Sequence, residues 1–282
     1  MTTDKTVYAK WIEDTSGTDG SDRTDGSDGS GTTDKNKVPD VLNGDDHYAY
    51  IIGYPEGDVR PNGQITRAEV ATIFFRMLTD EARTRYWNTE NSYTDVALEA
   101  WYNNAVSTAA VAGIVSGYPD GTFAPNAPIT RAEFAAIAAR FDSGPYTGDD
   151  YFSDTAGHWA NEYINRAAQR GWISGYEDGT FKPEQKITRA EAMTLVNNIL
   201  NRKPENADSL DDEMIAWPDN SDTSAWYYLA VQEATNSHHW EKGTDNTHEA
   251  WTGMREVRDW AALEQTYSNA QSAGEQESVY TN

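Results

Sequence analysis

The sequence contains no cysteine. The chain can therefore form no disulfide framework and needs no oxidising compartment, although cysteine-free secreted proteins also exist and the compartment stays open. It also lacks an apolar run of the roughly 20 residues that a membrane-spanning helix requires. The N-terminal stretch MTTDKTVYAKWIEDTSG has no apolar core of the signal-peptide kind. If the protein is exported, we expect this chain to be a piece of a longer one.

Basic residues are scarce. The sequence has 22 Lys and Arg against 46 Asp and Glu among its 282 residues, which gives a formal net charge of -24. A chain of this charge repels the phosphates of nucleic acids and of anionic lipids, so we expect neither as a partner. The length allows one or two domains.

Residues 14–39 contain little that a folded core could bury. The stretch DTSGTDGSDRTDGSDGSGTTDKNK is built mainly from Asp, Gly, Ser and Thr and is expected to form a flexible acidic linker. Asp recurs in it, but no window has the spacing D-x-[DN]-x-[DN]-G followed by a Glu ligand that a calcium loop needs. We therefore predict no metal site there.

Internal repetition dominates the sequence from residue 53 onward. Three segments align without a gap: GYPEGDVRPNGQITRAE at 53–69, GYPDGTFAPNAPITRAE at 117–133 and GYEDGTFKPEQKITRAE at 175–191. Each is followed by apolar residues at positions i, i+3, i+4 and i+7. This spacing predicts an amphipathic helix, called here a motif helix, that begins at the threonine of each ITRAE motif.

A second element recurs beside the first. The segments YTDVALEAWYNNAVSTAAVAG at 93–113, FSDTAGHWANEYINRAAQRG at 152–171 and WPDNSDTSAWYYLAVQEATNSH at 217–238 each place an Asp turn before a Trp and a small-residue helix, called here a tryptophan helix. Only DDHYAYII at 45–52 precedes the first motif helix, so the order is shifted. We therefore predict a mainly α fold, a pseudo-threefold helical bundle permuted so that the helix near 225–236 returns to complete the first repeat.

Helix capping explains two residue types of the ITRAE motif. Thr stands at the N-cap and Glu three residues later, which is the capping box, in which both side chains bond orphan backbone amides. These structural residues are Thr66 and Glu69, Thr130 and Glu133, and Thr188 and Glu191.

Helix capping does not explain the arginine of the motif. Arg67, Arg131 and Arg189 stand at the first helical position, where the helix dipole disfavours a cation by roughly several tenths of a kcal/mol. One interpretation is an anion site, in which the guanidinium and free helix-end amides bind a carboxylate or a phosphate. The other is a structural salt bridge to an Asp or Glu of a neighbouring repeat. We favour the anion site.

Three further sets of residues recur, and each has two interpretations. Gly53, Gly117 and Gly175 begin the GY turns and permit either a tight turn or the close approach of a ligand. Trp101, Trp159 and Trp226 can stack on a sugar face or pack between helices. Asp95, Asp154 and Asp219 are expected to form turns or caps, or to orient the arginines.

The sequence shows no catalytic signature. No Asp/Glu pair stands out from the repeat pattern, and neither G-x-S-x-G nor a phosphate loop occurs. The histidines lack metal-ligand spacing, and no H-E-x-x-H occurs; they are His47, His158, His238, His239 and His248. We therefore predict no enzyme, no cofactor and no metal ligand.

The three repeats resemble S-layer homology (SLH) modules. The resemblance covers roughly residues 40–250 and rests on the GYPDGTF…ITRAE and GYEDGTF…ITRAE segments and on the helix starts FSD…HWA at 152–160 and AWYY at 225–228. It implies a protein outside the cell, held non-covalently in the bacterial cell wall or S-layer. The implied ligands are secondary cell-wall polysaccharides, often with pyruvylated amino sugars, or peptidoglycan itself. A module for protein contacts or S-layer assembly is the alternative.

The resemblance also implies roles for particular residues. In the family, the motif arginines face the pyruvate carboxylate, and a Trp and backbone amides of the GY turn complete each groove. This implies ligand binding by the three arginines, tryptophans and turn glycines named above. The first repeat departs from the pattern, with Asp58 and Val59 in place of Thr-Phe, and its groove requires residues 217–238 to dock onto it.

The resemblance divides the chain into SLH repeats at 40–90, 91–144 and 145–204, followed by a half repeat at 205–251 that closes the bundle. The stretch EKGTDNTHEAWTGMREVRDW at 241–260 suggests one more short helix, and residues 252–282 are expected to contain a short helix and a disordered tail. TVYAKW, within residues 1–13, resembles the end of an internalin-type B-repeat. The displayed part of the protein is therefore expected on the N-terminal side.

The charge of the chain predicts how salt changes its binding to an anionic wall polymer. Long-range repulsion between two anions weakens with ionic strength. We expect the affinity for a pyruvylated polysaccharide to rise when salt is first added to a low-salt buffer, as measured by calorimetric titration. A flat salt response would contradict this expectation.

Overall fold

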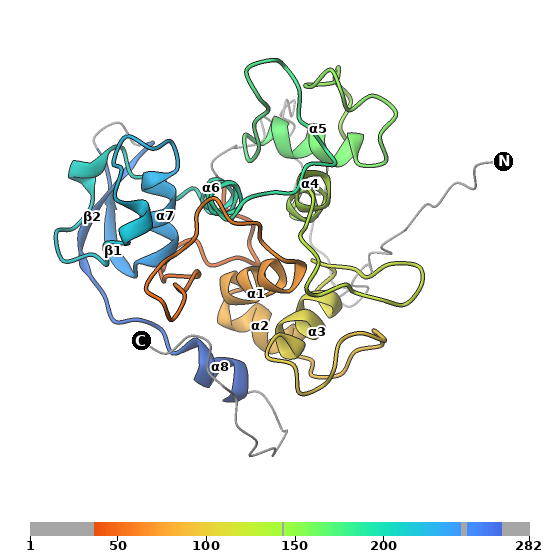
Figure 1. Ribbon diagram of the computed structural model, residues 1–282, viewed down its shortest axis with the longest axis horizontal. Coiled ribbons are helices and arrows are strands. Elements are labelled where there is room, and N and C mark those ends of the chain that lie inside the picture. Colours follow the sequence, from red (N-terminus) through yellow and green to blue (C-terminus); the bar gives the residue numbers. More distant parts are fainter. Residues whose placement is uncertain (1–36, 143, 244–246, 267–282) are drawn as a thin grey trace, which may run out of the picture. The chain divides into compact units, whose positions relative to one another are not determined.

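The computed structural model describes residues 37–142, 144–243 and 247–266. The motif helices are α1 (Arg67–Met77), α4 (Arg131–Ala139) and α6 (Arg189–Ile199), and the tryptophan helices are α3 (Asn103–Val111), α5 (Asn161–Gln169) and α7 (Tyr228–Thr235). One two-stranded antiparallel sheet, β1 (His238–Lys242) with β2 (Glu249–Met254), follows α7. The prediction of a mainly α fold is confirmed (Figure 1).

The internalin-like stretch and residues 14–36 of the predicted linker lie outside the described residues, as does the predicted tail beyond residue 266. Within the part of the chain that the structure describes, no helix has the length and apolar content needed to cross a membrane.

Each motif helix starts at a capping box. Thr66 accepts a hydrogen bond from the backbone N–H of Glu69 at 3.2 Å, and the Glu69 carboxylate accepts one from the backbone N–H of Thr66 at 2.8 Å. The same reciprocal pair is present at the starts of α4 and α6. The extended conformation of the capping threonine turns the chain sharply into the helix.

The isoleucine before each capping threonine joins the three repeats. The backbone N–H of Ile129 donates to the carbonyl of Ile65 at 3.1 Å, that of Ile187 to Ile129 at 3.0 Å, and that of Ile65 to Ile187 at 3.4 Å. These three hydrogen bonds close on themselves and are called here the isoleucine ring. The three side chains are buried at its centre. The ring defines the pseudo-threefold axis and holds the starts of the motif helices together.

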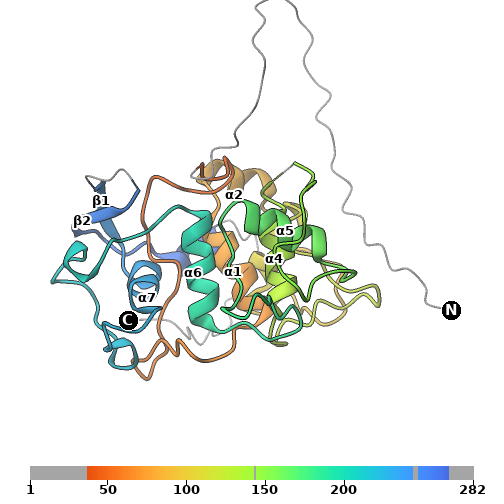
Figure 2. The same ribbon diagram turned by 90° about the horizontal axis from the view of Figure 1, so that it is seen from above.

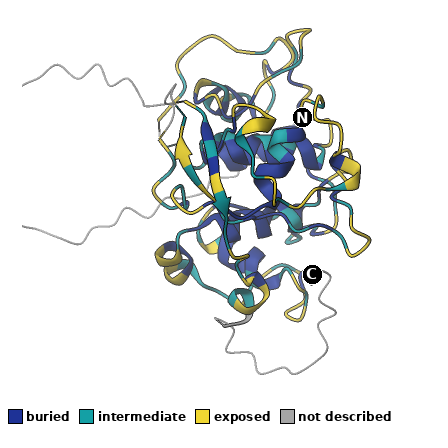
Figure 3. Ribbon diagram, turned by 90° about the vertical axis from the view of Figure 1, so that its left-hand side faces the viewer, coloured by how far each residue is buried: buried dark blue, intermediate teal, exposed yellow. Residues whose placement is uncertain are grey.

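The tryptophan helices pack outside the motif helices. Helix α3 packs on α1, α5 on α4, and α7 on α6, with α1, α4 and α6 between them in the view of Figure 1 and α6 beside α7 in Figure 2. The buried residues run along these helices (Figure 3). Aromatic rings join the repeats in the core, where the centroids of Phe74 and Phe134 lie 5.9 Å apart. One continuous core therefore serves all three repeats.

The C-terminal segment completes the first repeat, as the permuted arrangement predicts. The Asp219 carboxylate accepts hydrogen bonds from the backbone N–H groups of Val59, at 3.1 Å, and Arg60, at 2.7 Å. Asp95 and Asp154 bond the corresponding turns of the second and third repeats in the same way. The backbone N–H groups of Tyr50 and Ile51 both donate to the carbonyl of Ala234, each at 3.0 Å. Residues 217–238 therefore dock onto repeat 1.

A short helix, α8 (Trp260–Thr266), lies within residues 252–282. Most of the stretch 241–260 is not helical, because residues 238–254 form the β1–β2 hairpin, which the sequence did not predict. Glu249 and Trp251 are buried while Thr252 is exposed, so the burial follows the alternation of a strand and not the period of a helix. The structure also has a helix that the sequence did not predict, α2 (Asp80–Tyr86).

Asp219→Ala is expected to loosen the closure of the bundle. The substitution leaves two turn amides without their charged acceptor, which should lower the free energy of unfolding by about 1–3 kcal/mol. Urea denaturation of this variant, compared with the exposed-site control Asp212→Ala, measures the loss. A loss no larger than that of the control would show that Asp219 does not hold the turn.

Candidate functional site

Each motif arginine reaches into the next repeat and pairs with its capping-box glutamate. Nη1 of Arg67 lies 3.0 Å from Oε1 of Glu133, and Nη1 of Arg131 lies 2.7 Å from Oε1 of Glu191. Nη1 of Arg189, in the third repeat, lies 2.8 Å from Oε1 of Glu69, in the first. These three ion pairs are called here the arginine–glutamate ring. The arginines are at most 8% exposed.

The arginines also hold the turn of the next repeat. Nε of Arg67 donates to the carbonyl of Phe123 at 2.8 Å, and Nη2 donates to that of Ser116 at 2.8 Å. Arg131 makes the equivalent bonds to the third repeat, and Nε of Arg189 donates to the carbonyl of Val59 at 2.9 Å. Each guanidinium lies 4.7–4.9 Å from the ring centre of the GY tyrosine. Each arginine thus connects its own helix to the neighbouring GY turn.

The helix-end amides that we expected to be free are already hydrogen bonded. The backbone N–H of Arg67 donates to the carbonyl of Ala127 at 3.0 Å, and that of Ala68 to Pro125 at 2.9 Å. The corresponding amides of α4 and α6 donate to the turns that follow Pro183 and Pro61. This part of the sequence argument is wrong, because the neighbouring repeat already satisfies the amides. Carboxylate binding by the arginines stays a prediction, and only their guanidinium groups could contribute to it.

Each capping glutamate uses one carboxylate oxygen to cap its own helix and the other to bind the arginine and the GY tyrosine. Oε2 of Glu133 accepts from the backbone N–H of Thr130 at 2.8 Å, while Oε1 accepts from Arg67 and from the hydroxyl of Tyr118 at 2.6 Å. The GY tyrosines were not among the predicted site residues, although Tyr occurs in all three GY turns. Tyr54 and Tyr176 donate to their capping glutamates in the same way, each at 3.2 Å.

The protonation states of this pair follow from its surroundings. Burial by itself would raise the pKa of Glu133, but hydrogen bonds from Tyr118 and Thr130 and the charge of Arg67 outweigh burial and hold the pKa below its ordinary value. Burial and the bond to Glu133 raise the pKa of Tyr118 to about 12. At neutral pH the glutamate is therefore anionic and the tyrosine is a neutral donor.

The predicted tryptophans lie at the surface, not in the core. Trp101, Trp159 and Trp226 are 39%, 60% and 66% exposed. Trp226 lines a groove of about 330 Å³ together with Arg131, Tyr176 and Glu191. Trp101 lines a much smaller hollow, of about 30 Å³, with Glu69 and Arg189. Two tryptophans are therefore brought beside a pair of the arginine–glutamate ring.

The predicted glycines have a packing explanation. A Cβ atom on Gly53 would lie 2.2 Å from the ring of Trp217, one on Gly117 2.4 Å from Tyr93, and one on Gly175 2.5 Å from Phe152. Those aromatic residues stand two positions before Asp219, Asp95 and Asp154. The space that glycine leaves is therefore filled by the aromatic that begins the next Asp turn. Glycine and aspartate together dock the tryptophan-helix segment on the GY turn.

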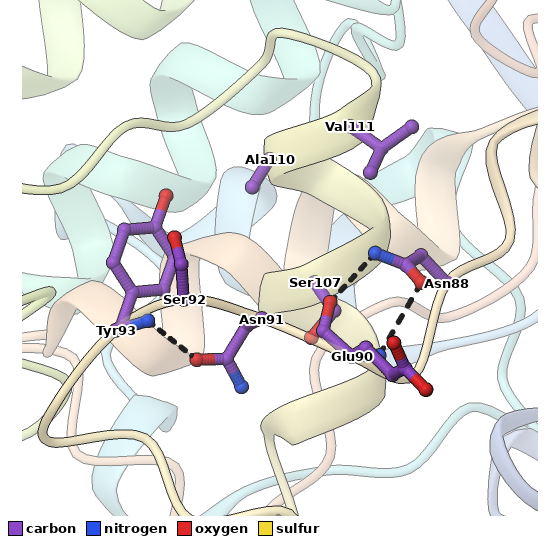
Figure 4. Close-up of a pocket in the computed structure, with 8 residues that line it drawn as sticks. All are labelled: Asn88, Glu90, Asn91, Ser92, Tyr93, Ser107, Ala110 and Val111. Carbon is purple, nitrogen blue, oxygen red and sulfur yellow. Dashed lines mark hydrogen bonds between the residues drawn. The ribbon is translucent and has the colours of Figure 1, made fainter.

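A larger cavity of about 440 Å³ lies elsewhere, between residues 88–93 and α3 (Figure 4). It is lined by polar side chains that already shape their own loop. The side-chain oxygen of Asn91 accepts from the backbone N–H of Tyr93 at 2.8 Å, and Nδ2 of Asn88 donates to the carbonyl of Glu90 at 2.6 Å. None of the predicted arginines, tryptophans, glycines or aspartates lines this cavity, so it is a weaker candidate than the groove at Trp226.

The fold brings two of the histidines into a cluster that their spacing in the sequence did not indicate. Their spacing in the sequence predicted no metal ligand, but the fold brings His47 and His238 together with Glu233 and Glu249, all four of them buried. Residues 47 and 238 are 191 positions apart in the sequence, so no local spacing could reveal the cluster.

Comparison with known proteins agrees with the repeat structure. Residues 48–71, 92–135 and 151–193 match the S-layer homology domain. The matched segments contain the GY turns and the ITRAE motifs, so the similarity to the S-layer homology domain extends over all three structural repeats.

Three relatives illustrate where such repeats occur. The chain is 41% identical over 183 residues to Cell surface glycoprotein 1 of Acetivibrio thermocellus, and 35% identical over 176 residues to the Cellulosome-anchoring protein of the same organism. It is 31% identical over 165 residues to the Amylopullulanase of Thermoanaerobacterium thermosulfurigenes. The alignments cover 60%, 60% and 54% of this chain but only 8%, 39% and 8% of those proteins. The chain thus spans less than half the length of each.

Glu133→Gln is expected to weaken the bundle in a pH-dependent way. The change removes the charge that pairs with Arg67 but keeps the shape of the side chain, and should lower the free energy of unfolding at neutral pH by about 1–3 kcal/mol. The folded-state pKa of Glu133 lies below 4.5, so its contribution is present above that pH and disappears as the pH falls through the folded value.

Urea unfolding at neutral pH and at about pH 3 measures this effect. The difference between wild type and Glu133→Gln should shrink at the lower pH, whereas the exposed control Glu99→Gln should differ little at either. A difference that is the same at both pH values would show that the charge of Glu133 does not stabilise the fold.

Proposed function

We propose that this chain anchors a larger surface protein non-covalently in the bacterial cell wall or S-layer. The similarity of its repeats to the S-layer homology domain and the names of its relatives, a cell surface glycoprotein and a cellulosome-anchoring protein, support a role in anchoring outside the cell. In this proposal the ligand is a cell-wall polysaccharide that carries pyruvylated amino sugars and lies in grooves between the repeats. The remainder of the protein carries the part that the cell displays.

The groove at Trp226 is the observation that carries the proposal. Its volume of about 330 Å³ suits one or two sugar residues, and the indole of Trp226 forms an exposed wall. Aromatic rings at such edges stack on the apolar faces of sugars, and their N–H groups add hydrogen bonds. The Arg131–Glu191 pair and the hydroxyl of Tyr176 lie in the same groove and supply polar contacts to sugar hydroxyls.

A pyruvate carboxylate would bind at the same arginine. A guanidinium has more N–H donors than Arg131 uses for its three protein acceptors. The remaining donors could receive an anionic substituent without breaking the pair with Glu191. The buried position of the pair strengthens any charged contact made there.

We propose a binding role and not a catalytic one. The carboxylates beside the tryptophans belong to the arginine–glutamate ring, and each of them already accepts an arginine, a tyrosine and its own helix-capping amide. A carboxylate committed to these structural donors is a poor proton carrier. The likeness to an amylopullulanase covers 8% of that enzyme.

Trp226→Ala tests the groove. The side chain is exposed, so its removal should leave the fold intact, and we expect the affinity for purified pyruvylated wall polysaccharide to fall about tenfold, the equivalent of about 1.4 kcal/mol. Calorimetric titration measures this, with Tyr151→Ala as a control that removes an exposed aromatic outside the groove.

Unchanged binding in Trp226→Ala would contradict the groove assignment. A second titration uses polysaccharide from which the ketal pyruvate has been removed. Loss of binding supports the anionic glycan, while undiminished binding to stripped polysaccharide excludes the carboxylate contact. No binding to either polysaccharide would favour peptidoglycan or a protein partner instead.

A further inference from the structure

We propose that His47, Glu233, His238 and Glu249 form a buried site for a divalent transition-metal ion of the zinc class. The ligand atoms offered by these four residues all lie within 4.8 Å of one another, and none of the four residues is more than 3% exposed. Two imidazole nitrogens and two carboxylate oxygens are a ligand set that suits Zn²⁺. The proposal does not depend on the wall-binding function.

Four of the six distances between the ligand atoms are close to those of a tetrahedral ion, and all six are within 4.8 Å. In a zinc site with bonds of about 2.0–2.1 Å, neighbouring ligand atoms lie about 3.3–3.4 Å apart. Nδ1 of His47 lies 3.1 Å from Nε2 of His238 and 3.3 Å from Oε1 of Glu249. It lies 3.5 Å from Oε1 of Glu233, and Nε2 of His238 lies 3.6 Å from Oε1 of Glu249.

The two carboxylate oxygens among the four ligand atoms have no hydrogen-bond donor of their own. Oε1 of Glu233 and Oε1 of Glu249 are fully buried and accept no hydrogen bond within the described residues. An unpaired buried carboxylate oxygen is expensive, and native structures give such groups a donor, a water or an ion. A cation between the two oxygens would satisfy both.

The surrounding groups orient the ligands as a metal site requires. Nδ1 of His238 lies 3.0 Å from the carbonyl of Asn236, so this nitrogen carries the proton and Nε2 offers its lone pair to the cluster. The other oxygen of Glu233 accepts from the indole N–H of Trp251 at 3.1 Å. Trp251 also stacks on His238, and Trp240 stacks on His47. Both rings and one carboxylate are therefore fixed in place.

The four ligands lie near one buried arginine. Arg202 is buried nearby, but its hydrogen bonds go to the backbone carbonyls of Asn43, Asp46 and Tyr48 and not to the carboxylates.

The ion would fasten the closure of the bundle. His47 lies near the start of the first repeat, Glu233 belongs to α7, and His238 and Glu249 begin the two strands of the hairpin. The backbone N–H of His238 also donates to the carbonyl of His47 at 3.0 Å. A cavity of about 420 Å³, lined in part by His47 and Trp240, lies beside the cluster. Metal binding would therefore join the start of repeat 1 to the segment that completes it.

The test begins with the full wild-type chain and Zn²⁺ as the probe. After removal of metal with a chelator, calorimetric titration with ZnCl₂ should show one tight site per chain, and Zn²⁺ should raise the melting temperature. Co²⁺ in its place should give the strong visible absorption of a tetrahedral ion. Wild-type protein that shows no shift in melting temperature with Zn²⁺ and no visible Co²⁺ band would overturn the proposal.

Variants with substitutions at or beside the cluster show whether the ion binds there. All of them keep the acidic linker, so a difference in Zn²⁺ affinity between them cannot come from the linker. Glu249→Gln keeps the size of the side chain but removes a ligand charge, and should lower the Zn²⁺ affinity by at least about tenfold. His239→Ala is the matched control, because His239 is the exposed neighbour of His238 on β1. Equal Zn²⁺ affinity and thermal shift in Glu249→Gln and wild type would overturn the assignment.

Discussion

The ring of backbone hydrogen bonds through Ile65, Ile129 and Ile187 is the constraint on which the rest of the fold depends. Each bond needs an N–H donor from one repeat and a carbonyl acceptor from another, so no repeat can satisfy the backbone groups of its own isoleucine. Around this ring the first amides of each motif helix are capped by the turn of the next repeat. Three repeats close the circle, and the absence of any one of them would leave buried donors without partners.

The arginine–glutamate ring follows from the same geometry. At the first helical position the arginine is unfavourable for its own helix, but that position places Arg67 opposite the capping glutamate and the GY turn of the next repeat. The local disadvantage is offset by the contacts between repeats. The same placement leaves two of the three ion pairs beside an exposed tryptophan, one in the groove of Trp226 and one in the smaller hollow of Trp101. Residues that hold the repeats together thus also shape the surface where a ligand is proposed to bind.

The structural features that repeat could be predicted from the sequence, whereas those that occur once could not. Threefold recurrence identified the motif helices, the tryptophan helices and the permuted closure. It left open whether Arg67 pairs with a ligand or with a glutamate, because that choice depends on a residue 66 positions away. The hairpin at 238–254 and the cluster at His47 have no second copy. Their partners meet only through the fold, so neither local periodicity nor motif spacing could find them.

The docking of Asp219 on the turn at Val59 has a consequence for the order in which the chain folds. The two residues are separated by 160 positions, whereas Asp95 and Phe123 are separated by 28. The turns of the second and third repeats can form as soon as their own segments have been synthesised. The first repeat, although made first, must wait with its apolar surface uncovered until almost the whole bundle has left the ribosome. Contacts of such long range slow folding, so the repeat of the bundle that is synthesised first is the last to be completed.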